Sequence, residues 1–489
     1  MTALPDTDPL DLGVLALRDA LRAGVVDPVE HLEGVLQRAA DRGAALGAFA
    51  RLLPDLSADQ ARHARDRLRA GHPRPLDGVP VPIKALTRLT GVPWDAGSAA
   101  LPASPAQVTD GVAESLLEAG TVTVGTTTAP EFGLPAYTEP AHQAPARTPW
   151  DPTRIAGGSS GGAAVAVACG IVPAAHGSDG GGSIRIPAAC CGVVGVKPSR
   201  GLISAGPHGV DGVGLVTDGV LARSVEDAAA VLEVMARTRP GDLAPLPLPP
   251  GGLVPGPGDG RTPRRIGMLL EPVVAEVEVH PAARRGVERA AASLRALGHE
   301  VVEIEAPIHP WQWQAFVPLW AAGAASLPVP PAAEEHLEPL TRWLREQGRR
   351  TTGAEVVAAL TEVQRLTRIV IDRLAVFDAI LSPVLSGPPP YPQEVRLADP
   401  SADFAAQSAM TPWTSLWNMI GAAAVALPLH RERIDGVEVP FGVQMGAVRR
   451  GQDAELLALA ARLAEVDPWP APPTGASAAT DAPTGEVGP

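Results

Sequence analysis

The chain has 489 residues, of which 45% are hydrophobic, and its formal net charge at pH 7 is −14. This acidic balance argues against a nucleic-acid binder, because such proteins gather Lys and Arg on one face to meet phosphates. The longest apolar stretches are too short to span a bilayer, and the N-terminus lacks the basic and apolar regions of a secretory signal. We therefore expect no membrane association and a cytoplasmic location.

Cysteine usage indicates a reducing compartment. Cys169, Cys190 and Cys191 all lie in apolar surroundings. Adjacent cysteines form a poor disulfide, and no Cys or His spacing in the chain is typical of zinc ligands. We expect buried packing thiols and no bound metal.

The first half of the chain predicts an α/β sheet preceded by helices. Amphipathic periodicity indicates helices at 11–23, 28–40, 57–70 and 111–119, and short apolar runs indicate strands at 81–84 and 121–124. Strands and helices continue to alternate up to Val196, which is typical of an α/β protein.

The second half begins after a segment dense in Pro and Gly, residues 239–261, which is either a surface excursion or a boundary between two lobes. Beyond it, the pattern predicts strands at 265–270, 300–304 and 379–382, helices at 281–297, 355–377 and 453–465, and a buried element at 421–427. Residues 469–489 are rich in Pro, Ala, Gly and Thr, and this composition predicts a disordered tail.

The most informative segment is 157–183, which reads GGSSGGAAVAVACGIVPAAHGSDGGGS. Ser183 follows three glycines, Gly180, Gly181 and Gly182, whose backbone N–H groups can turn toward one side and hold an oxyanion beside the serine hydroxyl. A serine hydroxyl attacks an amide only when a base lies within hydrogen-bond reach. Ser183 is therefore a candidate nucleophile that needs a base from elsewhere in the chain.

Lys84 is the candidate base. It ends the apolar run Val81–Lys84 and is followed by Ala85 and Leu86. A lysine accepts a proton only when neutral, and burial would lower its pKa from the ordinary value of about 10.4. Ser159 is the natural bridge, because it could relay a proton from Ser183 to Lys84.

Further motifs accompany these residues in a fixed order. They are GVPVPIK at 78–84, GTTTAPEFG at 125–133, PWDP at 149–152, the Gly/Ser-rich segment with SDGGGSIRIP within 154–200, and GVQ at 442–444. Together they resemble the amidase signature family over about residues 10–465, most strongly at 75–225. The resemblance implies an α/β fold with a large mixed central sheet covered by helices on both faces. It also implies one domain over 1–468, comprising N-terminal helices at 10–70, a signature core at 75–225 and a variable substrate-facing part at 263–440.

The resemblance also assigns catalytic roles. It implies that Ser183 is the nucleophile that carries the acyl group, that Lys84 is the base, and that Ser159, after a cis peptide bond, relays protons between them. The implied oxyanion hole is the backbone N–H groups of Gly180, Gly181, Gly182 and Ser183.

Three neighbours receive supporting roles. Asp179 and Arg185 flank the nucleophile and are expected to form a structural ion pair that positions the loop. Ser160 is expected to cap a helix or to line the site. The family usually has Asp after the lysine, whereas this chain has Ala85, so the resemblance does not say what supports Lys84 on that side.

The implied reaction is hydrolysis of a carboxylic amide to an acid and an amine or ammonia, with neither metal nor organic cofactor. The pattern is similar to the branch that contains 6-aminohexanoate cyclic-dimer hydrolases, but that branch is too diverse to fix the substrate. The expected partner is a small-molecule amide, contacted by the variable segments 307–339 and 377–419. The N-terminal helices, which often mediate dimerisation in the family, imply a possible homodimer.

Two alternative functions remain open from the sequence. Residues 157–161 also fit the G-x-S-x-G elbow of serine esterases, which needs a late histidine such as His430 and leaves Lys84 and Ser183 unused. Some members of the resembled family are glutaminase subunits of tRNA amidotransferases. His176 and His208 are expected to be core or loop histidines. Trp94, Trp150, Trp413 and Trp417 are expected to pack in the core, with one or two of them walling the acyl pocket.

Overall fold

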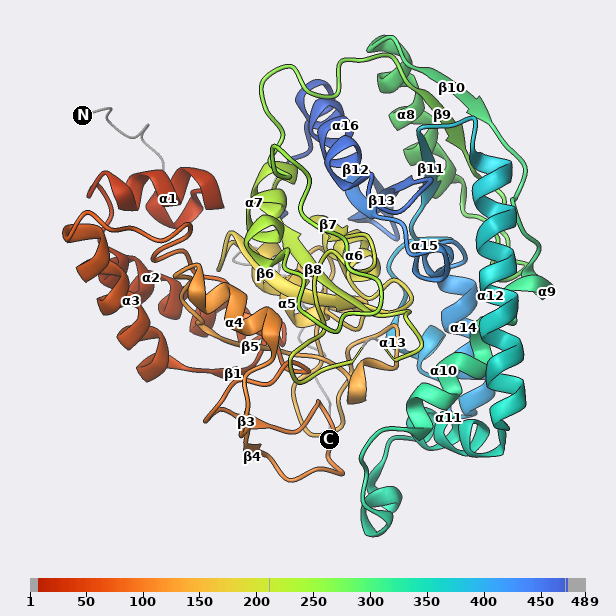
Figure 1. The fold of residues 1–489 in the computed structure, drawn as a ribbon, viewed down its shortest axis with the longest axis horizontal. Helices are drawn as coiled ribbons and strands as arrows, with labels where there is room; N and C mark the ends of the chain where they lie inside the picture. The colour runs from red at the N-terminus through yellow and green to blue at the C-terminus, as the bar shows by residue number, and fades with distance from the viewer. Residues whose placement is uncertain (1–7, 211, 471, 474–489) are drawn as a thin grey trace, which may run out of the picture.

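A computed structural model describes residues 8–210, 212–470, 472 and 473. Its centre is an eight-stranded sheet in the order β10-β9-β11-β13-β12-β7-β8-β6 (Figure 1). The strands are β6 (Ala174–Asp179), β7 (Val194–Lys197), β8 (Thr217–Ala222), β9 (Arg265–Met268), β10 (Glu300–Glu303), β11 (Ala379–Pro383), β12 (Ala424–Ile434) and β13 (Val437–Ala447). The pairs β10–β9 and β9–β11 are parallel and all others are antiparallel, which confirms a large mixed sheet.

Helices cover both faces of this sheet, as expected. The helices α5 (Gly161–Ala168) and α6 (Arg185–Cys191) pack together on one face, and α7 (Val225–Met235), α8 (Pro281–Ala296) and α16 (Asp453–Val466) contact one another on the other. Adjacent residues of β13 show the division, because Gly442 faces Ala189 of α6 whereas Val443 faces Gly286 of α8. Each face has its own apolar core.

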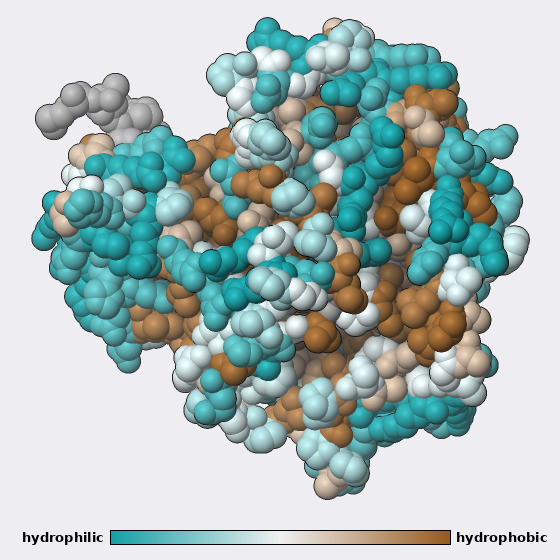
Figure 2. Space-filling view, viewed as in Figure 1, coloured by the Kyte–Doolittle hydropathy of each residue, from teal (hydrophilic) through white to brown (hydrophobic). Residues whose placement is uncertain are grey.

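The N-terminal part surrounds a second, smaller sheet. It contains α1 (Val14–Arg22), α2 (Pro28–Arg38), α3 (Pro54–Arg69), α4 (Gly111–Glu118), β1 (Phe49–Leu52), β2 (Ile83–Lys84) and β5 (Gly125–Thr127), with a separate pair β3 (Pro93–Trp94) and β4 (Ser104–Pro105). The three-stranded sheet has the order β1-β5-β2. Hydrophilic residues cover much of the outward surface of α1–α3, as their amphipathic periodicity predicts (Figure 2).

The position of one predicted strand is wrong. The expected strand at 121–124 contains only an isolated bridge between Val122 and Pro80, and the strand β5 begins three residues later, at Gly125. Pairing with β1 and β2 on either side selects Gly125–Thr127 over the more apolar run before it. Local hydrophobicity could not reveal those long-range partners.

The C-terminal half contains more helices than the sequence pattern predicted. The predicted helix at 355–377 is α12 (Gly353–Leu374). The elements that sequence patterning did not identify are α9 (Pro310–Trp313), α10 (Phe316–Ala325), α11 (Pro339–Arg350), α13 (Pro392–Val395), α14 (Pro400–Met410) and α15 (Thr414–Ile420). Several begin with Pro at the first position, where its missing N–H costs nothing.

The Pro- and Gly-rich segment 239–261 contains no helix or strand and behaves as a surface excursion. The strands before and after it, β8 and β9, belong to the same eight-stranded sheet. Leu253 is 2% exposed and anchors the segment in the main core. The excursion is therefore not a boundary between separate sheets.

The chain remains packed beyond residue 468, where the disordered tail was expected to begin. The Trp469 ring lies against the main core, and its Nε1 donates a hydrogen bond to the Arg223 carbonyl oxygen at 3.4 Å. Residues 471 and 474–489 of the predicted tail lie outside the described residues. Within the described ranges, none of the helices has the length and apolar character needed to cross a membrane.

Candidate active site

Lys84 lies at the end of β2 and is fully buried. Its Nζ is 2.8 Å from Ser159 Oγ, 3.0 Å from Ser178 Oγ and 3.2 Å from the Ser178 carbonyl oxygen. The sequence-predicted pair of Lys84 and Ser159 is therefore in direct hydrogen-bond contact across 75 residues of chain. Ser178, to which the sequence motifs assigned no role, is the third member of this group.

Burial makes Lys84 a potential base near neutral pH. Desolvation lowers the pKa of Lys84 to about 7, and the carboxylates of Asp179 and Asp218 act in the opposite direction. These two aspartates supply the negative charge near the ammonium, whereas the position after the lysine holds Ala85, whose N–H donates to the Thr127 carbonyl oxygen.

The sequence contains only two lysines. Comparison of the two shows that a lowered pKa is not enough for a base, because the amine must also contact a hydroxyl. Lys197 is also buried, and desolvation likewise lowers its pKa to about 7. Its Nζ, however, donates to the Pro198 carbonyl oxygen at 2.8 Å instead of meeting a serine. Of the two, Lys84 is placed to exchange a proton with a hydroxyl.

The first serine pair stands where α5 begins. The peptide bond between Gly158 and Ser159 is cis, as the family resemblance implies. Gly133 allows this arrangement, because a Cβ there would lie 3.2 Å from Ser159 Oγ and 2.5 Å from Leu86 Cδ1. Ser160 occupies the N-cap position, but its hydroxyl bonds to the backbone of Ser178 in β6 and makes no cap hydrogen bond.

The loop between β6 and α6 carries Ser183, which is 8% exposed. The Ser183 carbonyl oxygen accepts the Ser160 N–H at 3.0 Å, so the two serine clusters lie side by side. Gly182 adopts φ of +135°, and a Cβ there would lie 2.4 Å from Thr414 Oγ1, so only glycine fits this turn. Within the described chain, Ser183 Oγ has no protein hydrogen-bond partner.

Asp179 holds this loop from inside. Its carboxylate accepts the N–H groups of Gly182 at 2.8 Å and Ile184 at 3.1 Å, and it forms a two-point ion pair with Arg185. Burial alone would raise the pKa of Asp179, but Arg185, together with Lys197 and Asn418, more than offsets this effect and holds that pKa well below its usual range. The expected structural ion pair is present, and both partners are 0% exposed.

One of the N–H groups predicted for the oxyanion hole is unavailable, which leaves three candidate donors. The Gly182 N–H is already donated to Asp179, whereas the N–H groups of Gly180, Gly181 and Ser183 have no protein acceptor among the described residues. The prediction from the glycine run included Gly182, and the run itself gives no sign that one of its amides bonds to a carboxylate three residues earlier.

Arg185 extends the support of the loop to the C-terminal half. Its guanidinium donates to the Thr414 carbonyl oxygen at 2.7 Å, to Asn418 Oδ1 at 2.7 Å and to Gln444 Oε1 at 2.6 Å. Asn418 in turn donates to Asp179. Gln444 belongs to the GVQ motif, so this motif contributes to the site through Arg185.

A histidine and a carboxylate, which sequence reasoning did not place in the site, complete the surroundings of Lys84. His176 is fully buried in β6, as expected for a core histidine, but its Nδ1 accepts the Lys84 backbone N–H at 3.3 Å. Its Nε2 therefore carries the proton and faces Asp218 Oδ1 at 3.0 Å. The sequence does not link Asp218 to Lys84, because only the pairing of β8 with β6 brings Asp218 beside Ser178 and His176.

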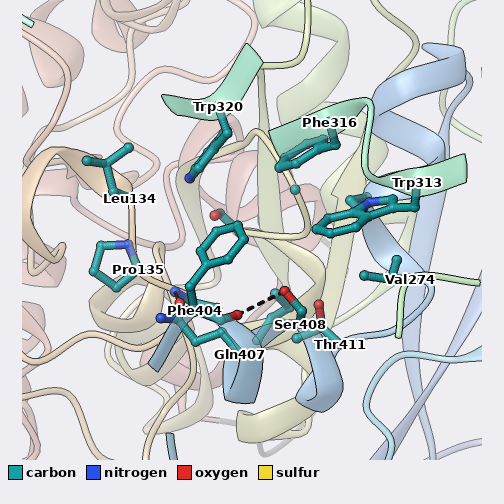
Figure 3. Close-up of a pocket in the computed structure, with 15 residues that line it drawn as sticks. Leu134, Pro135, Val274, Trp313, Phe316, Trp320, Phe404, Gln407, Ser408 and Thr411 are labelled. Carbon is teal, nitrogen blue, oxygen red and sulfur yellow. Dashed lines mark hydrogen bonds between the residues drawn. The ribbon is translucent and has the colours of Figure 1, made fainter. Parts of the chain in front are cut away.

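Ser183 opens onto a pocket lined by 15 residues (Figure 3). Its apolar lining includes Leu134, Val274, Trp313, Phe316, Trp320 and Phe404, and its polar lining includes Gln407, Ser408, Thr411 and Ser415. Most of these residues lie within 307–339 and 377–419, the segments expected to meet the substrate. Leu134 and Val274, from outside those segments, were missed.

The tryptophans named from the sequence do not line this pocket. Trp150, Trp413 and Trp417 donate their indole N–H groups to backbone carbonyl oxygens of Cys191, Glu271 and Ala447, respectively. Trp94 borders a different cavity. The tryptophans in the wall are Trp313 and Trp320, which belong to helices that hydrophobic periodicity did not reveal.

The esterase elbow does not assemble. Ser159 bonds to Lys84, whereas the His430 ring bonds to Glu432 on the same strand, β12. In the described part of the chain, no group of three or more His, Cys, Asp or Glu side chains could hold a metal ion. All three cysteines are buried free thiols, in agreement with the packing role expected for them.

Comparison with known proteins agrees with this geometry. The family model described as Amidase matches residues 30–457. The chain is 33% identical over 467 residues to the "Putative amidase" of Synechocystis sp., covering 93% of this chain and 88% of that protein. It is 34% identical over 476 residues to the "Putative amidase AmiB2" of Mycobacterium tuberculosis, covering 94% and 98%.

A solved structure gives the same fold. The structure of 6-aminohexanoate cyclic dimer hydrolase complexed with substrate superposes with a TM-score of 0.85 at 28% identity, over 94% of this chain and 98% of that one. The matched segment of the family model covers the small sheet, the serine loops and most of the central sheet. The chain belongs to the amidase family and is an amide hydrolase.

Proposed function

We propose that the enzyme hydrolyses a carboxylic amide through an acyl-enzyme on Ser183, with Lys84 as base and Ser159 as proton relay. The observation that carries this proposal is the buried Lys84 Nζ at 2.8 Å from Ser159 Oγ, beside a loop that presents Ser183 to an open pocket. The lowered pKa of Lys84, about 7, leaves a large neutral fraction at neutral pH.

Acylation begins with proton movement toward Lys84. Neutral Lys84 Nζ takes the proton of Ser159 Oγ as Ser159 takes the proton of Ser183, and Ser183 Oγ attacks the amide carbonyl carbon. This step needs a rotation that brings the two hydroxyls together, because the described structure has no hydrogen bond between them. The N–H groups of Gly180, Gly181 and Ser183 support the negative oxygen that develops.

Release of the amine and hydrolysis of the ester use the same groups in reverse. Ser159 donates its proton to the amide nitrogen as the C–N bond breaks, and Lys84 restores the proton to Ser159. A water molecule then gives a proton to the relay, attacks the acyl carbon, and Ser183 recovers its proton as the acid leaves.

Single substitutions test the assignment. Ser183→Ala, Ser159→Ala and Lys84→Met are each expected to lower kcat/KM for an amide substrate by at least about 1,000-fold, because members of a relay act as a unit. Release of the amine would be followed, and circular dichroism would show that each variant is folded. Ser104→Ala, at an exposed serine on β4, is the matched control with unchanged kinetics. Full activity of Ser183→Ala would contradict the proposal.

A further inference from the structure

The pocket beside Ser183 is a slot with one aromatic wall. The rings of Trp313 and Phe316 stack with centroids 5.2 Å apart at 17°, and those of Phe316 and Trp320 with centroids 5.3 Å apart at 24°. Phe404 and the polar side chains of α14 lie across the pocket from these rings (Figure 3). We call this space, between the three stacked rings and α14, the aromatic slot.

The polar groups of the slot are already hydrogen-bonded within the protein. Ser415 Oγ accepts the Trp313 indole N–H at 2.8 Å, and Ser408 Oγ donates to the Phe404 carbonyl oxygen at 2.9 Å. Thr411 Oγ1 lies 3.1 Å from Thr414 Oγ1. Ser408 would lose its internal acceptor by donating its O–H to a ligand, whereas Ser415, which accepts here, keeps its own O–H free to donate.

Both the oxygen and the nitrogen of the Gln407 side-chain amide are hydrogen-bonded within the protein. Its Oε1 accepts the Ala136 N–H at 2.6 Å, and its Nε2 donates to Asp403. The Asp403 carboxylate also accepts from Tyr137 Oη at 2.9 Å and from the Leu397 N–H at 3.0 Å. The carboxylate behind Gln407 is therefore occupied by partners inside the protein.

None of the 15 described residues that line the pocket is Asp, Glu, Lys, Arg or His. A charged substrate group would lose its hydration on entering and would find no counter-charge, which is strongly unfavourable. A flat apolar group would instead displace water from the aromatic wall and pack against it. The slot therefore discriminates on charge as well as on shape.

We propose that the aromatic slot binds an uncharged aryl or comparably flat apolar group of the amide substrate, and that the enzyme rejects amides that carry a charge on this group. The inference rests on Ser183 as nucleophile and goes beyond it by naming the substrate class. A free amino acid amide such as glutamine, which carries both an ammonium and a carboxylate, does not match this lining.

Binding to Ser183→Ala, measured by isothermal titration calorimetry, tests the slot independently of catalysis. Phenylacetamide carries its ring on the acyl side and acetanilide on the amine side, and 4-carboxyphenylacetamide and 4-carboxyacetanilide are their charged counterparts. We expect each charged ligand to bind at least about 10-fold more weakly than its neutral counterpart. The tighter of the two neutral ligands identifies which side of the amide the slot receives. Equal binding of charged and neutral ligands would overturn the proposal.

Kinetics of wild-type enzyme and two tryptophan variants provide the second test. Trp320→Ala is expected to lower kcat/KM for the preferred aryl amide about 10- to 100-fold, with a much smaller effect on acetamide, which does not fill the slot. Trp311→Ala, in the same short helix as Trp313 but 71% exposed, is the matched control and leaves both values unchanged. Equal losses for both substrates in Trp320→Ala would show that Trp320 supports the fold and does not select substrate.

The two proposals fail in different ways. Aryl amides that bind to the slot but are hydrolysed equally well by wild type and Ser183→Ala would overturn the nucleophile and leave the slot standing. Hydrolysis that depends on Ser183 but favours the charged amides would overturn the slot and leave the nucleophile standing.

Discussion

At the scale of single residues, the site depends on two buried groups held in opposite electrostatic states. Burial lowers the pKa of Lys84 to about 7, which favours its neutral form, whereas Arg185 keeps Asp179 ionised although it is fully buried. Neutral Lys84 can accept a proton, and ionised Asp179 can accept two backbone N–H groups of the serine loop. In the proposed mechanism, Lys84 is therefore the base, and Asp179 supports the backbone of the serine loop.

The pH dependence follows from the neutral form of Lys84. We expect kcat/KM to rise with pH through about 7 and then to level off, because deprotonation creates the base. The chain contains only two lysines, so NMR of protein labelled with ¹³C-lysine can follow the titration of Lys84 directly, with Lys84→Met assigning the signal. The Lys84 titration and the kinetic profile should have the same midpoint. A flat profile, or one that falls as pH rises, would contradict the neutral base.

Asp218→Asn probes the carboxylate that sequence reasoning missed. Its negative charge stabilises the Lys84 ammonium and raises the pKa of Lys84, so removing the charge should move the rising limb to lower pH. Asp59→Asn, at an exposed position on α3, is the control that leaves the limb in place. If Asp218 had only a structural role, Asp218→Asn would lower kcat/KM without shifting the pH at which kcat/KM rises.

At the scale of elements, the turn from β6 into α6 presents Ser183, the proposed nucleophile. Asp179 at the end of β6 accepts two N–H groups of the turn, Arg185 at the start of α6 binds Asp179, and α15 contacts both through Asn418. Gly182 permits the turn through its positive φ and its approach to Thr414. The turn is therefore fixed by the two elements that flank it and by α15, which is distant in sequence.

Gly182→Ala should disrupt this turn. The new Cβ would meet Thr414 Oγ1 at 2.4 Å in addition to the strain of φ +135°, and we expect kcat/KM to fall by about 100-fold or more as the oxyanion donors move. Gly258→Ala, where φ is +96° and no atom lies within 4 Å, isolates the cost of backbone strain. Both variants would be compared by amide turnover and by thermal unfolding. Equal activity in the two would show that the Thr414 contact is unimportant.

The sequence predicted which residues lie together at this site better than it predicted their surroundings. The residues Lys84, Ser159 and Ser183 were predicted from motifs, and their placement follows because short-range patterns encode the strand end and the two serine turns. The motifs did not predict that Asp218, Ser178 and Trp320 belong to the site, because strand pairing and helix packing bring these residues there from separate segments. The hydrogen bond from the Gly182 N–H to Asp179 likewise depends on where the folded chain places the Asp179 carboxylate.

At the scale of the whole molecule, the central sheet separates two apolar cores and places the site at one end of α5 and α6. Lys84 comes from the small sheet, the serines from the face covered by α5 and α6, and the aromatic slot from helices of the C-terminal half. The alternation of strands and helices predicted an α/β protein, and the family resemblance implied the large mixed sheet and its covered faces. The sequence pattern did not identify α9–α11 and α13–α15: α9 and α13 have only 4 residues each and α15 is buried on every side, although α11 does carry an apolar stripe at Leu340 and Leu344.

The central claim is that Ser183, and neither Ser159 nor Ser160, forms the covalent intermediate. The direct measurement is reaction of the full-length enzyme with a fluorophosphonate, followed by peptide mass spectrometry to locate the adduct. We predict a single adduct on Ser183, with labelling lost in Ser183→Ala and strongly slowed in Lys84→Met. An adduct on Ser159 or Ser160 in the wild-type enzyme would contradict the assignment of nucleophile and relay.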